Sequence, residues 1–74
     1  MNTDSFAWAL RKLCRRRPFK TFAVELVTGE LLRVVHPEAM AIRRNLIYFV
    51  EPDEERRYLD ATSVCQLFAS ARNR

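Results

Sequence analysis

The stretch that decides the fold is FKTFAVELVTGELLRVVH, residues 19–36. Apolar side chains recur at every second position from Phe22 to Leu26 and again from Leu32 to Val34, on either side of Thr28-Gly29. A period of two is typical of strands that bury one face. Gly29 is the only glycine in the chain, and a turn position that needs a positive φ explains it. The stretch therefore predicts a β-hairpin with strands at residues 19–27 and 30–36.

Four more short strands are predicted after this hairpin. Pro37 cannot donate a ladder hydrogen bond, so the second strand should end or bend at His36-Pro37. The later strands are expected at residues 38–42, 46–50, 57–60 and 64–68, with turns at 43–45 and 52–55 and a corner at 61–63. Residues 46–50 (LIYFV) are apolar on both faces, a pattern that barrel closure or subunit packing produces.

A helix is predicted before the hairpin, at about residues 5–16, capped by Asp4 or Thr3. One apolar stripe follows helical spacing: Phe6, Ala9, Leu10, Leu13 and Cys14. Trp8 falls outside this stripe. Pro18 disfavours helical geometry at Arg17, which sets the expected end of the helix.

The expected fold is therefore mainly β and forms a single domain over residues 1–74. An N-terminal helix precedes a strongly bent, five- to six-stranded antiparallel sheet, closed into a small barrel over about residues 19–68, and residues 69–74 form a frayed tail. A chain of this length buries only about 60% of the surface that its unfolded form exposes. With 49% hydrophobic residues, we expect part of the apolar surface to lie between subunits of a homo-oligomer.

The residues offer little for catalysis or metal binding. His36 is the only histidine, and we interpret it as a structural or interface residue. The sequence has neither a Gly-rich phosphate loop nor a ligand-spaced cluster of His, Cys and Asp, so we expect no enzyme activity, cofactor or metal. Cys14 and Cys65 are too few for a disulfide framework and are expected to be reduced. We see neither a signal peptide nor an apolar run of bilayer length, so we expect no membrane role and a cytoplasmic protein.

The charge distribution is the strongest functional signal. Residues 1–20 carry six Lys or Arg against one Asp, whereas residues 21–71 carry five Arg against eight acidic residues. A basic segment on an acidic body predicts a phosphate-bearing partner such as RNA. The candidate phosphate contacts are Arg11, Lys12, Arg15, Arg16 and Arg17, with Arg43 and Arg44 as secondary contacts. A solvated helix face and a pairing surface between subunits stay open as alternatives. Tyr48, Phe49 and Tyr58 could stack on bases, although we favour a place in the core for them.

Two resemblances accompany these features. The order Arg17-Pro18-Phe19, Gly29 and then VHPE at residues 35–38 resembles a group of short bacterial proteins of unknown function. That likeness covers most of the chain up to about residue 50. It supports the hairpin layout and implies no activity.

The chain is also similar to the Sm-like proteins, especially the Hfq group of bacterial RNA chaperones. The similar pieces are DSF and ALRK at residues 4–6 and 9–12, LVTG at 26–29, and YLDA followed by SV at 58–61 and 63–64. This resemblance implies a barrel of Sm-like or SH3-like type, a ring of subunits and RNA binding. The family's basic rim falls on Arg11 and Lys12, with Arg15 beside them. Its uridine-contacting Lys-His pair falls on Leu59 and Asp60, and its base-stacking aromatic residue falls on Glu25.

The sequence thus predicts a non-catalytic, Sm-like nucleic-acid-binding homo-oligomer. The alternative is a protein-interaction or oligomerisation module with no nucleic-acid role.

Overall fold

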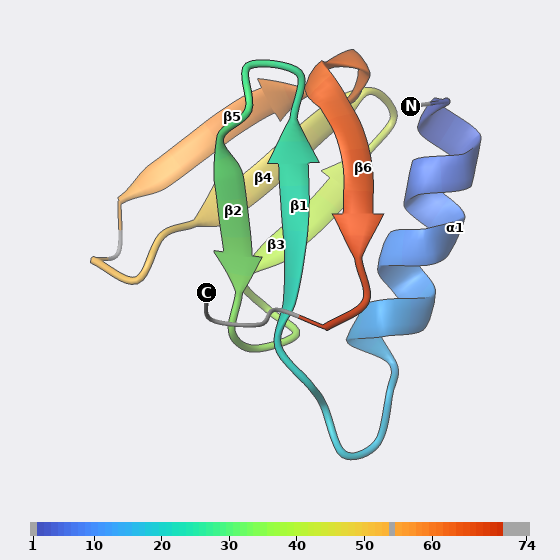
Figure 1. Cartoon of the computed structure of the whole chain (residues 1–74), viewed down its shortest axis with the longest axis vertical. Coiled ribbons are helices and arrows are strands. Elements are labelled where there is room, and N and C mark those ends of the chain that lie inside the picture. The colour runs from blue at the N-terminus through green and yellow to red at the C-terminus, as the bar shows by residue number, and fades with distance from the viewer. Residues whose placement is uncertain (1, 54, 71–74) are drawn as a thin grey trace.

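The computed structural model describes residues 2–53 and 55–70, which form an N-terminal helix and two antiparallel sheets of three strands each (Figure 1). The fold is mainly β, as the periodicity predicts. Helix α1 spans Thr3–Cys14. The strands are β1 Phe22–Leu26, β2 Leu31–Val34, β3 Met40–Arg43, β4 Leu46–Val50, β5 Arg56–Asp60 and β6 Val64–Phe68, and the short 3₁₀ helix η1 Ala61–Ser63 joins the last two.

The strands are divided between two sheets rather than forming one continuous bent sheet. The first sheet has the order β2-β1-β6 and the second has the order β3-β4-β5. In Figure 1 the first sheet stands in front, the second crosses behind it, and α1 lies beside β6. The separation falls at residues 35–39, where Pro37 has no N–H for a ladder and the Ala39 N–H donates to the His36 carbonyl (3.0 Å) to close a turn.

The first hairpin forms where the sequence predicts it, but its strands are shorter than residues 19–27 and 30–36. Phe22 pairs with Val34 and Glu25 with Leu31. Gly29 has a φ of +92° in the connecting turn, which explains why glycine stands there. Strand ends fray where side chains are no longer buried, and Val27 and Val35 are both exposed.

The later strands follow the prediction closely. β4 and β6 have the predicted bounds, β5 begins one residue earlier, and the corner at residues 61–63 is η1. The third strand is shifted: Arg43, expected in a turn, is the last residue of β3, while Arg44 takes a φ of +57° at the tip. Of the expected frayed tail, only Ala69 and Ser70 lie within the described residues.

The predicted helix bounds and its predicted cap are wrong. Asn2, rather than Asp4 or Thr3, caps α1, because its Oδ1 accepts the N–H groups of Asp4 (2.8 Å) and Ser5 (3.2 Å). The helix ends at Cys14 instead of Arg16, and the Arg15 N–H closes the last turn on the Arg11 and Lys12 carbonyls. The chain then reverses through a cis Arg17-Pro18 peptide bond.

The core lies between the two sheets and beneath α1. Its buried side chains are Phe6, Leu10, Phe22, Val24, Leu26, Leu32, Val34, Ala39, Met40, Ile47, Phe49, Ala61 and Val64. Helix α1 contributes Phe6 and Leu10 from its apolar stripe, and β1 contributes every second residue. The hydrophobic effect therefore fixes which face of α1 is turned inward and leaves the opposite face free.

A group of charged side chains connects the two sheets at one end. The guanidinium of Arg57 in β5 contacts both carboxylate oxygens of Glu30, next to the first hairpin turn, at 2.6 and 3.0 Å. It also contacts Glu51, just after β4, at 3.1 Å. These contacts raise the pKa of Arg57 and, chiefly through the side-chain hydrogen bond, lower that of Glu30. The sheets are thereby joined by a planar, bidentate ion pair.

Candidate nucleic-acid interface

The exposed face of α1 carries an aromatic side chain and three cations, which we call the basic face: Trp8, Arg11, Lys12 and Arg15. All four side chains are exposed, because Phe6 and Leu10 turn the opposite side of the helix into the core. Within residues 2–53 and 55–70, the recorded ion pairs are those of Arg57 and of His36 with Glu38, so the three cations have no carboxylate partner there. Their charge is available to a ligand.

Arg16 and Arg17 make hydrogen bonds to backbone carbonyls within the domain. Arg16 Nη2 donates to the carbonyls of Lys20 (3.0 Å) and Ala69 (2.9 Å). Arg16 thus holds the chain after α1 against the end of β6, and its buried Nε has no hydrogen-bond partner among the described protein atoms. Arg17 Nη1 donates to the Arg16 carbonyl (3.2 Å). Arg16 is therefore first a structural residue.

The two secondary candidates lie apart from the basic face. Arg43 and Arg44 stand at the β3–β4 turn, whose Asn45 carbonyl accepts the Ala61 N–H (2.7 Å). In Figure 1 this turn lies at the end of the molecule where α1 begins, whereas Arg15 follows the other end of the helix. Tyr58 and Asp60 line the same shallow surface as the two arginines. The structure does not bring the seven candidate cations into one patch.

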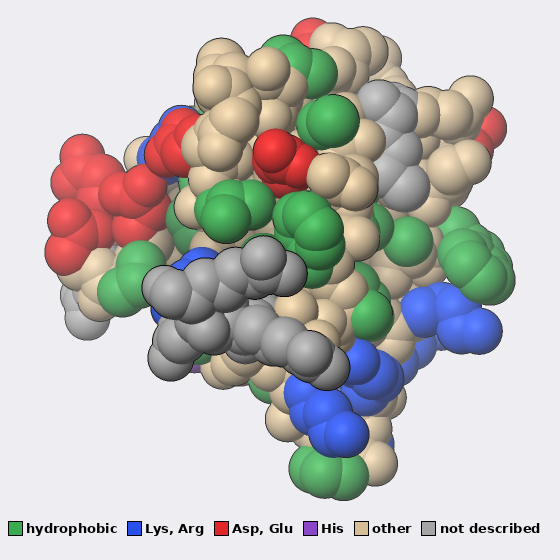
Figure 2. Space-filling view, viewed as in Figure 1, with side chains coloured by type: hydrophobic (Ala, Val, Ile, Leu, Met, Phe, Trp, Pro, Cys, Tyr) green, Lys and Arg blue, Asp and Glu red, His purple; other side chains and the backbone are tan. Residues whose placement is uncertain are grey.

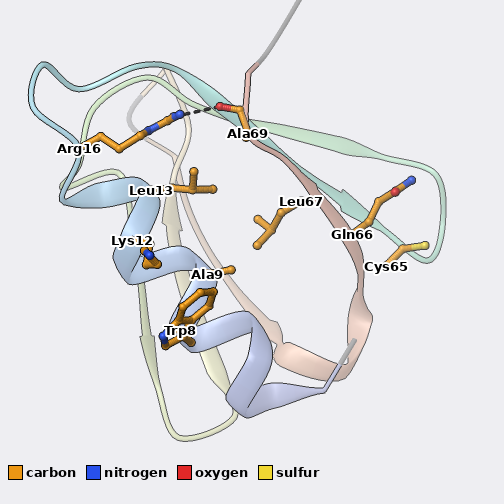
Figure 3. A pocket seen from close by; sticks show the side chains of 9 residues that line it. All are labelled: Trp8, Ala9, Lys12, Leu13, Arg16, Cys65, Gln66, Leu67 and Ala69. Carbon is orange, nitrogen blue, oxygen red and sulfur yellow. Dashed lines mark hydrogen bonds between the residues drawn. The ribbon is translucent and has the colours of Figure 1, made fainter.

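An apolar groove of about 640 Å³ runs between α1 and β6 (Figure 3). Leu13 of α1 and Leu67 of β6 point toward one another across it. Its complete lining is Trp8, Ala9, Lys12, Leu13, Arg16, Cys65, Gln66, Leu67 and Ala69. The only charged groups in this lining are the two cations, so the groove is apolar inside and positive at its rim.

Trp8 and Lys12 form a pair at the edge of the groove. The Lys12 ammonium lies 4.8 Å from the centroid of the indole ring, a cation–π contact between residues one helical turn apart. The indole nevertheless stays 63% exposed. The sequence argument missed Trp8 as a site residue, although the i, i+4 spacing of Trp8 and Lys12 outside the apolar stripe was the available signal.

Positive and negative side chains gather at different ends of the molecule. In Figure 2, Lys and Arg cluster at the lower right, over the C-terminal half of α1 and the segment after it. The largest group of Asp and Glu lies at the left, over the turn between β4 and β5. On the face that this view shows, Lys and Arg are therefore separated from the largest group of Asp and Glu.

The aromatic residues and the histidine that the sequence analysis considered differ in burial and in their neighbours. Phe49 is buried, as favoured, and Tyr48 packs its ring against Tyr58 at 5.4 Å between centroids. Tyr58 itself is 62% exposed, which corrects its placement in the core. His36 is exposed beside Glu38, its Nδ1 3.7 Å from the carboxylate.

The positions aligned with the RNA-contacting residues of Sm-like proteins serve the fold. The Asp60 carboxylate caps η1 by accepting the backbone N–H (2.9 Å) and hydroxyl (2.8 Å) of Thr62, and these bonds lower the pKa of Asp60. Glu25 accepts a hydrogen bond from the Gln66 side chain across β1 and β6. Both side chains therefore have partners within the domain.

The two thiols are free and differ in exposure. Cys65 is exposed in β6, whereas Cys14 is partly covered, and burial, with a smaller effect of Glu38, raises the pKa of its thiol. Cys14 is therefore protonated at neutral pH.

Neither metal-binding side chains nor a spanning helix marks the described segments. Residues 2–53 and 55–70 contain no group of three or more His, Cys, Asp or Glu arranged to hold a metal ion. In the same residues, no helix has the length and apolar character required to cross a bilayer. Comparison of the chain with protein-family models, curated proteins and solved structures found no match.

Proposed function

We propose that this chain is a non-catalytic nucleic-acid-binding protein that meets phosphates with the basic face of α1. The observation that carries the proposal is the exposure of Arg11, Lys12 and Arg15 without carboxylate partners among the described residues. Cations that are not neutralised internally release the counterions of a polyanion when they bind it, which supplies the free energy of phosphate recognition.

The position of these cations on the helix favours one continuous contact. The Cα atoms of Arg11 and Arg15 are about 6 Å apart along the helix axis, and Lys12 lies between them. Long exposed side chains at this spacing can contact neighbouring phosphates of one strand. Arg43 and Arg44 would reach only a longer strand or another molecule.

We also propose that the two sheets are the halves of a small barrel of Sm-like or SH3-like type. Three features support this: β2 leads into β3 through a bend of five residues, η1 joins the two sheets between β5 and β6, and β6 returns to pair with β1. In this reading β2 and β3 are the two arms of one bent strand. The proposed compartment stays the cytoplasm.

Self-association is part of the same proposal. The outer face of the second sheet carries Leu46, 50% exposed, and the Tyr48–Tyr58 pair, although polar side chains would be expected on a solvated face. A second copy of this chain would cover such a patch. β5 and β6 are edge strands of their sheets, and strands of neighbouring subunits would pair there.

The alternative function, a protein-interaction module without a nucleic-acid role, is favoured by one observation. The groove between α1 and the edge strand β6 has the layout in which domains add an extended peptide to a sheet. Its positive rim would select an acidic peptide.

The proposal is tested with two double variants of equal charge change. Arg11→Gln with Arg15→Gln alters the basic face, whereas Arg33→Gln with Arg56→Gln removes two exposed charges from β2 and β5. Fluorescence anisotropy with a labelled short RNA measures the affinity at low salt. The affinity should fall about tenfold or more for the first variant and less than about threefold for the second. Equal losses, or no binding by the unaltered protein at micromolar concentration, contradict the proposal.

A further inference from the structure

We propose that the groove between α1 and β6 is a single-strand subsite in which Trp8 stacks on a base while Lys12 holds the adjacent phosphate. This inference rests on the proposed function and adds to it the class of nucleic acid: single-stranded rather than duplex. It names a base-contacting residue that phosphate binding by the basic face does not require.

The exposure of Trp8 is the first observation. Trp8 is 63% exposed, so burial of its indole contributes little to the stability of the fold. The side chains that α1 contributes to the core are Phe6 and Leu10. Lys12 lies over the ring, yet most of the indole surface stays open to solvent. A base can therefore stack on the free surface, and aromatic stacking is tolerant of base identity.

The second observation is the charge of the groove. Two cations, Lys12 and Arg16, stand at its rim, and its floor is made by Ala9, Leu13 and Leu67. Among the described residues no carboxylate lines it, so its chemistry complements a ligand that is apolar and planar on one side and anionic on the other. A nucleotide strand has both properties, with bases on one side and phosphates on the other.

The third observation is the length of the groove. Trp8 and Leu13 both line it and are five residues apart in α1, which corresponds to about 7.5 Å along the helix axis, and Arg16 lies beyond the end of the helix. That length accommodates about two stacked nucleotides at about 3.4 Å each. Arg11 and Arg15 flank the same path on the basic face and would extend the contact to the next phosphates.

A duplex does not fit this arrangement. Its bases are stacked inside and present only their edges, so they cannot lie flat on Trp8. The basic face could still attract duplex phosphates, but the indole would contribute nothing. Preference for a single strand is therefore the property that distinguishes this subsite from phosphate attraction alone.

The experiment uses the full chain and three probes: a short oligothymidylate, an abasic strand of the same length and a duplex of the same length. Trp8 is the only tryptophan, so its fluorescence reports directly on the site. We expect oligothymidylate to quench Trp8 emission and the other two probes to leave it largely unchanged. Trp8→Ala should weaken oligothymidylate binding about tenfold, Trp8→Phe should restore most of it, and binding of the abasic strand should change less than about twofold.

The matched control is Val27→Ala, which removes an apolar side chain of similar exposure (67%) at the far side of the hairpin and should not change affinity. The rate at which Cys65 is alkylated provides a second measurement, because Cys65 is exposed and lines the groove. This rate should fall when oligothymidylate binds.

The outcomes separate this inference from the proposed function. If all three probes bind equally, Trp8 emission stays constant on binding and Trp8→Ala leaves the affinities unchanged, the proposed subsite is overturned. Phosphate binding by the basic face then still stands. If none of the probes binds, both proposals are wrong. If a poly-glutamate peptide quenches Trp8 and oligothymidylate does not, the groove is a protein-binding site and the inference is overturned.

Discussion

At the residue scale, identical side chains in one basic run have different roles. Arg15 and Arg16 are neighbours in the sequence, yet Arg15 is exposed and Arg16 donates to the carbonyls of Lys20 and Ala69. The helix ends at Cys14, Arg15 is its C-cap, and Arg16 in the following segment donates to the end of β6. Counting charges predicts a basic segment, but only the position of the helix end decides which cations a ligand can reach.

This difference predicts unequal effects of substituting the two arginines on stability. Arg16→Ala should lower the free energy of unfolding by about 1–3 kcal/mol, because hydrogen bonds from a charged donor are lost and two carbonyls lose their partner. Arg15→Ala should change it by less than about 0.5 kcal/mol, as exposed substitutions do. Urea denaturation measures both, and equal effects of the two substitutions would show that the Arg16 contacts are not stabilising.

The carboxylates with lowered pKa values predict an acid-dependent loss of stability. Glu30 is held below its ordinary pKa of 4.5 chiefly by hydrogen bonds from Arg57, and Asp60 below 3.8 by hydrogen bonds from Thr62. Because the folded state favours their charged forms, their stabilising effect is present above these ordinary values and is lost as pH falls through the folded pKa values.

Thermal unfolding should therefore show a melting temperature that is nearly constant between neutral pH and about pH 5 and falls below it. Arg57→Gln should lower the melting temperature at neutral pH and reduce the acid-dependent decrease, since Glu30 then loses its partner. A pH profile that Arg57→Gln leaves unaltered would show that this ion pair does not join the sheets energetically.

At the element scale, the alternation of apolar residues predicts most strands, and the ends are where prediction fails. β4 and β6 are predicted with their bounds, β4 directly after the turn at Asn45 and β6 directly after η1. The first hairpin strands are shorter than predicted, and Val27 and Val35, which extend the apolar stretches, are exposed. The helix begins earlier than predicted, since Asn2 is a capping residue as good as Asp4.

The hairpin turn provides a testable prediction about a single element. A Cβ added at Gly29 meets no atom within 4 Å, so only its φ of +92° opposes a side chain. Gly29→Ala should destabilise the protein by about 1–2 kcal/mol, and Gly29→Asn by less, because Asn tolerates positive φ. Equilibrium denaturation tests the order. An alanine variant as stable as the original would show that the turn can adopt an ordinary φ.

At the scale of the whole molecule, patterning predicts a helix followed by antiparallel strands but not their division into two sheets. That division depends on the bend at residues 35–39, where Pro37 has no N–H for a ladder and the following residues Ala39 and Met40 are buried. Only part of the candidate site is predictable from the sequence. The basic face follows from helical spacing, whereas the groove requires β6 to lie beside α1, a contact between distant parts of the chain.

The exposed apolar patch of the second sheet predicts an oligomer. Sedimentation or light scattering should give a mass that is a multiple of the 8.7 kDa chain mass. Leu46→Lys and Tyr58→Lys should lower that mass by placing charge on the patch, and Val27→Lys, at an equally exposed position, should not. A single-chain mass at tens of micromolar protein contradicts self-association.

The central claim is that unpaired cations of α1 bind phosphates, and the salt dependence of binding tests it most directly. With three cations engaged on a single strand, the logarithm of the association constant should fall with the logarithm of salt concentration with a slope of about −2. Arg11→Gln with Arg15→Gln should reduce the slope to about −0.7. A slope near zero, or an equal slope for the unaltered protein and this variant, would contradict the account.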